Sequence, residues 1–220
     1  MTESSEVSFW RANGLSLVLA GIFVTCLIGQ VWSGHLAFND ELLREGRVPI
    51  GLAAYLGSGH FLSSLMENWE SEFLQMGMYV LLTVSLRQRG SAESRPLSAA
   101  EEEERIDRGP KPWPLRAGRA WRWLYSNSLA IALLLLFAAS FAGHAYESWR
   151  LELAEREAAG EAAVSLADHL TGAQFWFESM QNWQSEFLAV LALVVLSIFL
   201  RQDKSPQSKP LEAPHGQTGT

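Results

Sequence analysis

Four long stretches of uncharged residues limit the folds that this sequence can adopt. Asp, Glu, Lys and Arg are absent from residues 15–32, 73–86, 129–142 and 187–200, whereas charged residues crowd the connections between them. A helix of a soluble domain carries polar residues at every third or fourth position along one face. The stretches 129–142 and 187–200 have no such face. We therefore predict an all-α membrane protein with four transmembrane helices.

The second half of the chain repeats the first. When the sequence is shifted by 114 positions, residues 13–99 align with residues 127–213 without a gap, and 28 of the 87 aligned pairs are identical. The identities include Asn-Trp-x-Ser-Glu-Phe-Leu in the same register, which two unrelated apolar helices would not share by chance. Each copy contains two spans, so both copies enter the membrane in the same direction. The expected fold is a pair of parallel-repeat helical hairpins.

The duplication also sets the expected domain boundaries. They are an N-terminus (1–12), a first repeat (13–99), a loop with an interfacial segment (100–126), a second repeat (127–213) and a disordered tail (214–220). Thirteen of the 17 Lys and Arg residues lie in the termini and the middle loop. By the positive-inside rule, these parts are expected to be cytoplasmic.

Local signals predict how the connections are built. The first span of each copy should continue outward as a helix and finish at the aligned glycines Gly46 and Gly160. The middle loop carries an acidic run at 101–104, followed by prolines that exclude a continuous helix before about residue 114. The tryptophans and arginines after these prolines predict an anchor at the membrane interface.

The Asn-Trp-x-Ser-Glu motif is expected to enter the membrane. Residues 73–86 and 187–200 are 14 residues each, so as helices they cover only about 21 Å of a hydrocarbon core of about 30 Å. Arg87 and Arg201 close their cytoplasmic ends. The missing length must therefore come from the outer side, where the motif lies.

Two hypotheses account for this motif. In the first, Glu72 and Glu186 bind a small cation or a proton, because ionisable residues inside spans are costly and often functional. In the second, which we favour, the polar residues form interhelical hydrogen bonds and the tryptophans anchor the interface. The candidate residues are Asn68, Trp69, Ser71, Glu72, Gln75, Asn182, Trp183, Ser185 and Glu186, with Gln30 and His144 at a similar depth on the preceding spans.

Helical geometry refines these candidates. Asn68, Glu72, Gln75 and Tyr79 share one sector of a helical wheel, which is expected to face protein. In the second copy the polar stripe stops after Glu186. Rise per residue also predicts that Asn68 neighbours Gln30 and that Asn182 neighbours His144.

Other chemistry finds little support in the sequence. Cys26 is the single cysteine and lies within the first span, so an internal disulfide or a Cys-x-x-Cys motif is excluded. The histidines at 35, 60, 144 and 169 have no metal-ligand spacing, so neither a metal nor a cofactor is expected. No hydrolase elbow or phosphate loop is present, and nothing indicates nucleic acid. We therefore do not expect an enzyme.

Two stretches carry a resemblance to a known family. "HFLSSLMENWESEFLQMGMYVLLTVSLRQRGSAESRP" (60–96) and "LYSNSLAIALLLLFAASFAGHA" (124–145) resemble a family of uncharacterised bacterial integral membrane proteins with a domain of unknown function. That resemblance implies the bacterial cytoplasmic membrane but no activity. The family's second motif commonly reads "ENWQSEF", whereas this chain has Gln181 in place of the acid. A role that needs an acid immediately before Asn182 is therefore in doubt.

Two functions follow from these observations. The first is a structural or envelope-associated protein of the bacterial inner membrane, which meets protein partners or further copies of itself. The alternative is a small oligomeric transporter or channel for protons or cations that uses Glu72 and Glu186.

Overall fold

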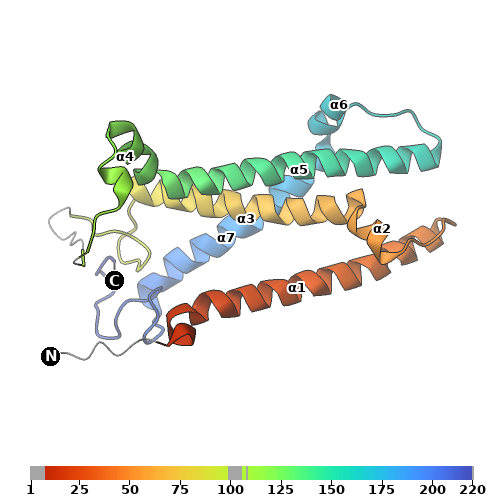
Figure 1. Ribbon diagram of the computed structural model, residues 1–220. Helices are drawn as coiled ribbons and strands as arrows, with labels where there is room; N and C mark the ends of the chain where they lie inside the picture. The colour runs from red at the N-terminus through yellow and green to blue at the C-terminus, as the bar shows by residue number, and fades with distance from the viewer. Residues whose placement is uncertain (1–7, 99–105, 108, 220) are drawn as a thin grey trace. The chain divides into compact units, whose positions relative to one another are not determined.

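The computed structural model of this protein describes residues 8–98, 106–107 and 109–219. Within that part, the regular structure is helical and contains no strand. The elements are α1 (Phe9–Arg44), α2 (Leu52–Leu56), α3 (Gly59–Ser85), a 3₁₀ turn η2 (Trp113–Leu115), α4 (Arg119–Ser126), α5 (Ser128–Ala159), α6 (Leu166–Thr171) and α7 (Ala173–Phe199) (Figure 1). The predicted acidic run at 101–104 and the first seven residues lie outside the described part.

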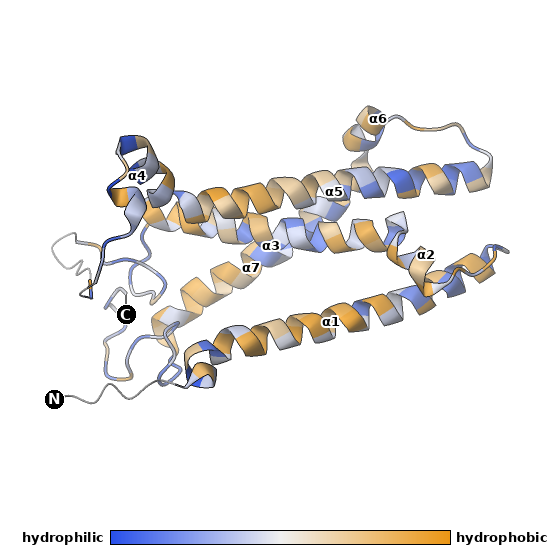
Figure 2. Cartoon of the chain, in the orientation of Figure 1, coloured by the Kyte–Doolittle hydropathy of each residue, from blue (hydrophilic) through white to orange (hydrophobic). Residues whose placement is uncertain are grey.

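Three of the described helices are long and apolar enough to cross a membrane. They are α1 with 36 residues, α5 with 32 and α7 with 27. Helix α3 also has 27 residues, a length of about 40 Å, but the half nearer α2 carries three glutamates and is more polar (Figure 2). Length and composition thus indicate three spans in the described chain, and the predicted fourth is taken up below.

The chain divides into two compact units, and the first extends to Leu62. Its core is Tyr55, which is 2% exposed. The connection after α1 is held back against that helix by Asn39, whose side chain accepts from the Ile50 amide at 2.8 Å and donates to the Ile50 carbonyl at 3.0 Å. Burial raises the pKa of the Tyr55 hydroxyl. Four rings lie within 6.0 Å of the Tyr55 ring, centroid to centroid: His35, Phe38, His60 and Phe61.

Gly34 makes room for Tyr55, and this gives a first prediction. A Cβ atom on Gly34 would lie 2.2 Å from the Tyr55 hydroxyl oxygen. Gly34→Ala is expected to cost about 1–2 kcal/mol of stability, because the surrounding rings prevent Tyr55 from moving away. Adding Tyr55→Phe should recover part of the loss in a thermal unfolding experiment.

Gly29→Ala is the matched control. Gly29 lies on the same helix as Gly34, and a Cβ atom at this position would have no neighbouring atom within 4 Å. Alanine is a better helix former than glycine, so this variant should be as stable as the wild type or slightly more stable. Equal stability of the Gly34 and Gly29 variants would show that Tyr55 does not require the missing side chain.

Helices α1 and α5 end as the sequence predicts. Gly46 and Gly160 have φ angles of +74° and +73°, in the left-handed region that glycine adopts without strain. In each case the residue after the glycine donates its amide to a carbonyl five residues earlier, at 2.7 Å and 2.8 Å. This pair of C-terminal caps confirms the predicted helix ends.

Further elements recur at the spacing of the sequence duplication. Helix α6 begins 114 residues after α2, and α7 begins and ends 114 residues after α3. The segments that follow α3 and α7 also share a hydrogen bond. The Gln88 amide donates to Ser94 Oγ at 3.0 Å, and the Gln202 amide donates to Ser208 Oγ at 2.9 Å. The two halves of the chain therefore use the same local structure after their second long helix.

The C-terminal segment differs from the predicted disorder. Lys209 is 1% exposed, and its ammonium group donates to the carbonyls of His215 and Gln217, both at 2.9 Å. The Gly219 amide donates to the Ser91 carbonyl at 2.9 Å. Burial, and next the charge of Arg201, lower the Lys209 pKa. A high content of proline and serine favours disorder on average. Here, however, the buried Lys209 ammonium group donates hydrogen bonds to several backbone carbonyls and thereby orders the segment.

The connection before α4 follows the predicted effect of its prolines. In its described residues, no continuous helix precedes η2, and α4 begins at Arg119. The rings of Trp113 and Trp121 lie 5.2 Å apart, and both indoles are largely exposed. Exposed tryptophans suit the headgroup level of a membrane, so the interfacial role stays a prediction.

Candidate functional site

Two glycines let α3 and α5 approach each other in the second unit, which begins at Ser63. A Cβ on Gly143 would lie 3.0 Å from the Met66 side chain, and a Cβ on Gly77 would lie 3.3 Å from Leu134. Figure 1 shows the two helices side by side. Small residues at such crossings let polar side chains reach a neighbouring helix.

Glu70 connects three helices at this level. Its carboxylate, on α3, is 0% exposed. One oxygen lies 3.1 Å from His144 Nδ1 on α5, and the other accepts from Trp183 Nε1 on α7 at 3.1 Å. A buried carboxylate needs such donors, because its desolvation is otherwise costly. Glu70 therefore holds α5 and α7 against α3.

One ring nitrogen of His144 is within hydrogen-bond distance of Glu70, whereas the other forms no hydrogen bond. The imidazole is 0% exposed and stacks on the Phe175 ring, with centroids 5.0 Å apart. Nε2 forms no hydrogen bond, although it is buried. It faces the Glu178 carboxylate at 3.9 Å, a distance that is too long for a hydrogen bond.

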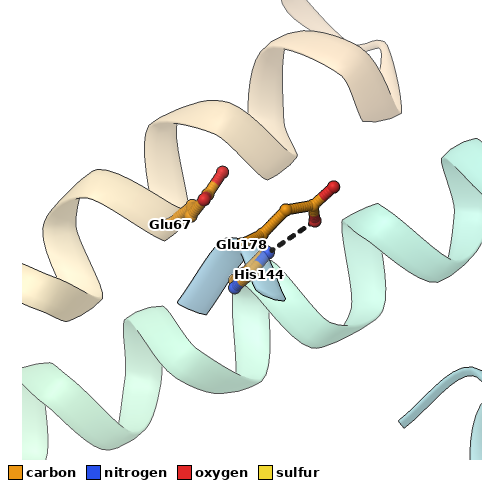
Figure 3. Close-up of side chains that lie close together, drawn as sticks. All are labelled: Glu67, His144 and Glu178. Carbon is orange, nitrogen blue, oxygen red and sulfur yellow. Dashed lines mark ion pairs between the residues drawn. The ribbon is translucent and has the colours of Figure 1, made fainter. Parts of the chain in front are cut away.

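A second carboxylate converges on the same nitrogen. Glu67, on α3, accepts a hydrogen bond from the Asn182 side-chain amide on α7. A ring nitrogen of His144 and one carboxylate oxygen each from Glu67 and Glu178 lie within 4.8 Å of one another, and Nε2 is the nitrogen that faces Glu178. Figure 3 shows these three side chains close together on three helices, with the ion pair between His144 and Glu178 as a dashed line. We call Glu67, Glu70, His144 and Glu178 the buried cluster.

The buried cluster carries an excess of negative charge. In the described part of the chain, no lysine or arginine forms an ion pair with Glu67, Glu70 or Glu178. The Glu178 carboxylate also accepts from Gln174 Nε2 at 2.7 Å, which adds a donor but no charge. A cation at the point of convergence would balance these carboxylates.

A neighbouring histidine shows the contrast. His169 lies 2.6 Å from Glu152 through Nδ1 and 2.8 Å from Ser148 Oγ through Nε2, and Arg156 also donates to Glu152. Both nitrogens of His169 therefore have partners, so this second group is complete as a structural network. His144 lacks that completeness.

Some of the residues singled out in the sequence belong to the buried cluster or touch it. His144 and Asn182, which were predicted to be neighbours, both contact its glutamates. Trp183 donates a hydrogen bond to Glu70 and so helps to join α7 to α3. Its predicted role as an anchor at the membrane interface stays a prediction. Gln30 lies on α1, in the first unit.

The remaining predicted residues lie elsewhere. Glu72 is exposed, and Glu186 is half-buried within electrostatic range of it. Gln75 is buried and donates to the Glu186 carbonyl at 3.0 Å, which joins α3 to α7. The hydroxyls of Ser71 and Ser185 donate to carbonyls of their own helices, and Trp69 is half-buried.

The predicted wheel sector of α3 needs a correction. Gln75 of that sector is buried and Tyr79 is half-buried, as predicted, but Asn68 and Glu72 are exposed, and Glu70 and Ser71 are buried instead. Polarity alone placed the sector, but the rotation of a helix is set by its closest packing contacts. In α3, Glu70 lies on the side that packs against α5 and α7.

The sequence reasoning overlooked Glu67, Glu70 and Glu178, because it concentrated on positions that are identical in the two copies. These three residues align with Gln181, Gln184 and Ser64, and His144 aligns with Gln30. A difference between the two copies could have revealed them. Each is an ionisable residue in a long helix, and the aligned residue of the other copy is an amide or a serine.

The described helices indicate a helical membrane protein with a buried histidine–carboxylate cluster. The chain belongs to a family described as "Domain of unknown function (DUF6766)", whose family model matches residues 6–220. This confirms the resemblance to an uncharacterised family. No curated protein and no solved structure matches the chain significantly.

Proposed function

We propose that this protein is a four-span protein of the bacterial cytoplasmic membrane that binds a cation in the buried cluster. The observation that carries the proposal is Nε2 of His144, which is buried without a hydrogen bond and faces the Glu178 carboxylate, with the Glu67 carboxylate in the same group. Ionisable residues that face the interior of a helix bundle commonly serve ions or protons. The proposed fold is the pair of hairpin repeats with cytoplasmic termini.

The proposal treats α3 as the fourth span. Its length of about 40 Å exceeds the hydrocarbon thickness of about 30 Å. Its glutamates lower the mean hydropathy, but Glu70 is fully buried against α5 and α7 rather than exposed to lipid. A helix with an internal polar site can therefore span the membrane without meeting a simple hydropathy criterion.

Cysteine labelling tests this topology. Cys26 is the single cysteine, so a Cys26→Ser background allows one reporter at a time. We expect Val48→Cys, before α3, to react with an impermeant maleimide from outside the cell. Leu97→Cys, after α3, should react only after the membrane is opened. Labelling of both positions from the same side would show that α3 does not cross.

The duplication supports a role beyond helix pairing. Each member of the buried cluster aligns with a neutral residue in the other copy: Gln181, Gln184, Gln30 and Ser64. Amides and hydroxyls are sufficient to join helices in a membrane. Three carboxylates and an imidazole at the matching positions are therefore more than packing requires, and their desolvation is costly unless a positive charge joins them.

Thermal unfolding with a panel of cations tests the proposed function. In detergent, at least one cation among Na⁺, K⁺, Mg²⁺, Ca²⁺, Mn²⁺ and Zn²⁺ should raise the unfolding temperature of the full chain. At about 100 times its Kd, a ligand adds about 2.7 kcal/mol, which for a chain of this size corresponds to a shift of about 5–10 °C. Glu67→Gln with Glu178→Gln should abolish the shift.

Glu72→Gln with Glu186→Gln is the matched control, since it removes two carboxylates from the same two helices. We expect the shift to persist in this variant. If instead it is lost here and kept in the Glu67 and Glu178 variant, the cation site is the pair first predicted from the sequence. If no cation protects the wild-type protein, the proposed function is wrong.

A structural or envelope-associated role is the second candidate. The observation in its favour is the C-terminal end of α5, where Glu155 and Glu157 are exposed, as is Glu161, which follows the cap and pairs with Arg156. An acidic, exposed helix end suits a basic protein partner or a second copy of the chain. The same thermal unfolding experiment separates the two candidate functions. If the cluster is purely structural, no cation of the panel should raise the unfolding temperature more than the others.

A further inference from the structure

We propose that the buried cluster binds a divalent first-row transition metal ion, such as Zn²⁺. His144 Nε2 and one carboxylate oxygen each from Glu67 and Glu178 are the ligands, and Glu70 is a positioning residue. This inference rests on the proposed function, because it specifies which cation the cluster takes. It goes further by assigning a chemical class to the ligand.

The hydrogen bond between His144 and Glu70 fixes the tautomer. An ionised carboxylate only accepts hydrogen bonds, so Nδ1 of His144 carries the proton that it shares with Glu70 at 3.1 Å. In the neutral imidazole, Nε2 then presents a lone pair. Metal-bound histidines almost always donate their other ring N–H to a carboxylate or a carbonyl in this way. The imidazole is thus already oriented as a metal ligand.

The donor set indicates the class of metal. One imidazole nitrogen and two carboxylate oxygens are ligands that Zn²⁺, Mn²⁺, Fe²⁺ and Co²⁺ accept. Ca²⁺ and Mg²⁺ prefer sites made entirely of oxygen. Among the described residues, the group consists of three His, Asp, Glu or Cys side chains, which leaves a fourth tetrahedral position for water or an incoming ligand.

The distances leave room for an ion with small side-chain movements. A tetrahedral Zn²⁺ with bonds of about 2.1 Å separates neighbouring ligand atoms by about 3.4 Å. Nε2 lies 3.9 Å from the Glu178 oxygen, and all three ligand atoms lie within 4.8 Å of one another. Glu67 and Glu178 are only half-buried. Rotation of their side chains closes this gap without moving the backbone.

Charge balance favours a divalent ion over a proton on Nε2. With neutral His144, the three carboxylates of the buried cluster carry a formal charge of −3. A proton on Nε2 would reduce this to −2 and would still be too far from Glu178 for a hydrogen bond. A divalent ion reduces the charge to −1 and binds all three ligands at once.

Metal binding to the full chain, purified in detergent without a histidine tag and stripped of metal, tests the inference. A competition titration against a chromophoric chelator should show one Zn²⁺ bound per chain. Co²⁺ in place of Zn²⁺ should give visible absorption bands that report nitrogen and oxygen ligands. Glu67→Gln with Glu178→Gln should weaken Zn²⁺ binding at least 100-fold, and His144→Gln should abolish the Co²⁺ bands.

Two further variants distinguish ligands from their surroundings. Glu70→Gln should weaken binding by about 10–100-fold and shift the Co²⁺ bands, because the imidazole loses its orienting carboxylate. Glu72→Gln with Glu186→Gln should leave both readouts within twofold of the wild type. Circular dichroism and gel filtration confirm that each variant is folded before its affinity is compared.

The outcomes separate this inference from the proposed function. Stoichiometric Zn²⁺ binding that depends on His144, Glu67 and Glu178 supports both. Binding of Na⁺, K⁺, Mg²⁺ or Ca²⁺ alone, lost in the same variants, overturns the transition-metal assignment and keeps the cation site. Zn²⁺ binding that survives both the His144 variant and the Glu67 and Glu178 variant overturns the assignment as well. If no cation binds, both proposals are wrong.

Discussion

Glu70→Ala is expected to lower the stability of the protein by about 2–5 kcal/mol, since each donor left without an acceptor inside the protein costs about 1–3 kcal/mol. Glu70 is 0% exposed and accepts from His144 on α5 and from Trp183 on α7. In the alanine variant, two ring N–H groups lose their acceptor inside the protein. Unfolding by heat, or by titration with a denaturing detergent, measures the effect.

Glu72→Ala provides the matched control, because Glu72 lies two residues further along α3 and is exposed. Its replacement should change stability by no more than about 0.5 kcal/mol. The chain itself offers a second comparison. Glu70→Gln with His144→Gln installs the amides found at the aligned positions 184 and 30, and it should be more stable than the sum of the two single changes implies. Equal stability of the Glu70 and Glu72 alanine variants would rule out Glu70 as a structural link.

Gly143→Val is expected to cost about 2–3 kcal/mol and to weaken cation binding at the same time. A Cβ at this position would already lie 3.0 Å from the Cγ and Sδ atoms of Met66, and valine adds two methyl groups beyond it. Overpacking of this kind forces helices apart or side chains out of their rotamers. Because Gly143 precedes His144, the same displacement moves the imidazole away from the glutamates of α3.

Gly29→Val is the control, since Gly29 is the aligned glycine of the first copy and a Cβ there meets nothing within 4 Å. Valine has a somewhat higher helix propensity than glycine, so this change should be neutral or slightly stabilising. Met66→Ala in the Gly143→Val background should restore part of the stability and of the cation-dependent shift in unfolding temperature. A Gly143 variant that unfolds like the Gly29 variant would show that α3 and α5 do not need this close approach.

Sequence reasoning was successful where a signal is local. The positive φ angles of Gly46 and Gly160 and the late start of α4 at Arg119 follow from residue types and their immediate neighbours. Helical continuity through the Asn-Trp-x-Ser-Glu motif also follows, because α3 and α7 run unbroken through it. These features depend on glycine conformation, proline geometry and helical periodicity, which act over a few residues.

The candidate site was less accessible to sequence reasoning. His144 and Asn182 were among the candidates, but their contacts Glu70 and Glu67 lie 74 and 115 residues away in the chain. Emphasis on the identical Glu72 and Glu186 drew attention to residues that the structure leaves exposed or half-buried. The cluster consists instead of residues that differ between the copies, where a comparison of identities has no signal.

The sequence by itself determined the helical class, the membrane-length apolar segments and the ends of α1 and α5, because each depends on hydrophobicity and backbone preference within one segment. Only the tertiary structure decided which carboxylates lie together. At Gly77, α3 lies close to Leu134 of α5, and in this arrangement Glu70 is buried whereas Glu72 is exposed. A rotation of 100° separates successive residues. Contacts between residues far apart in the chain therefore decide that Glu70, rather than Glu72, meets the interior.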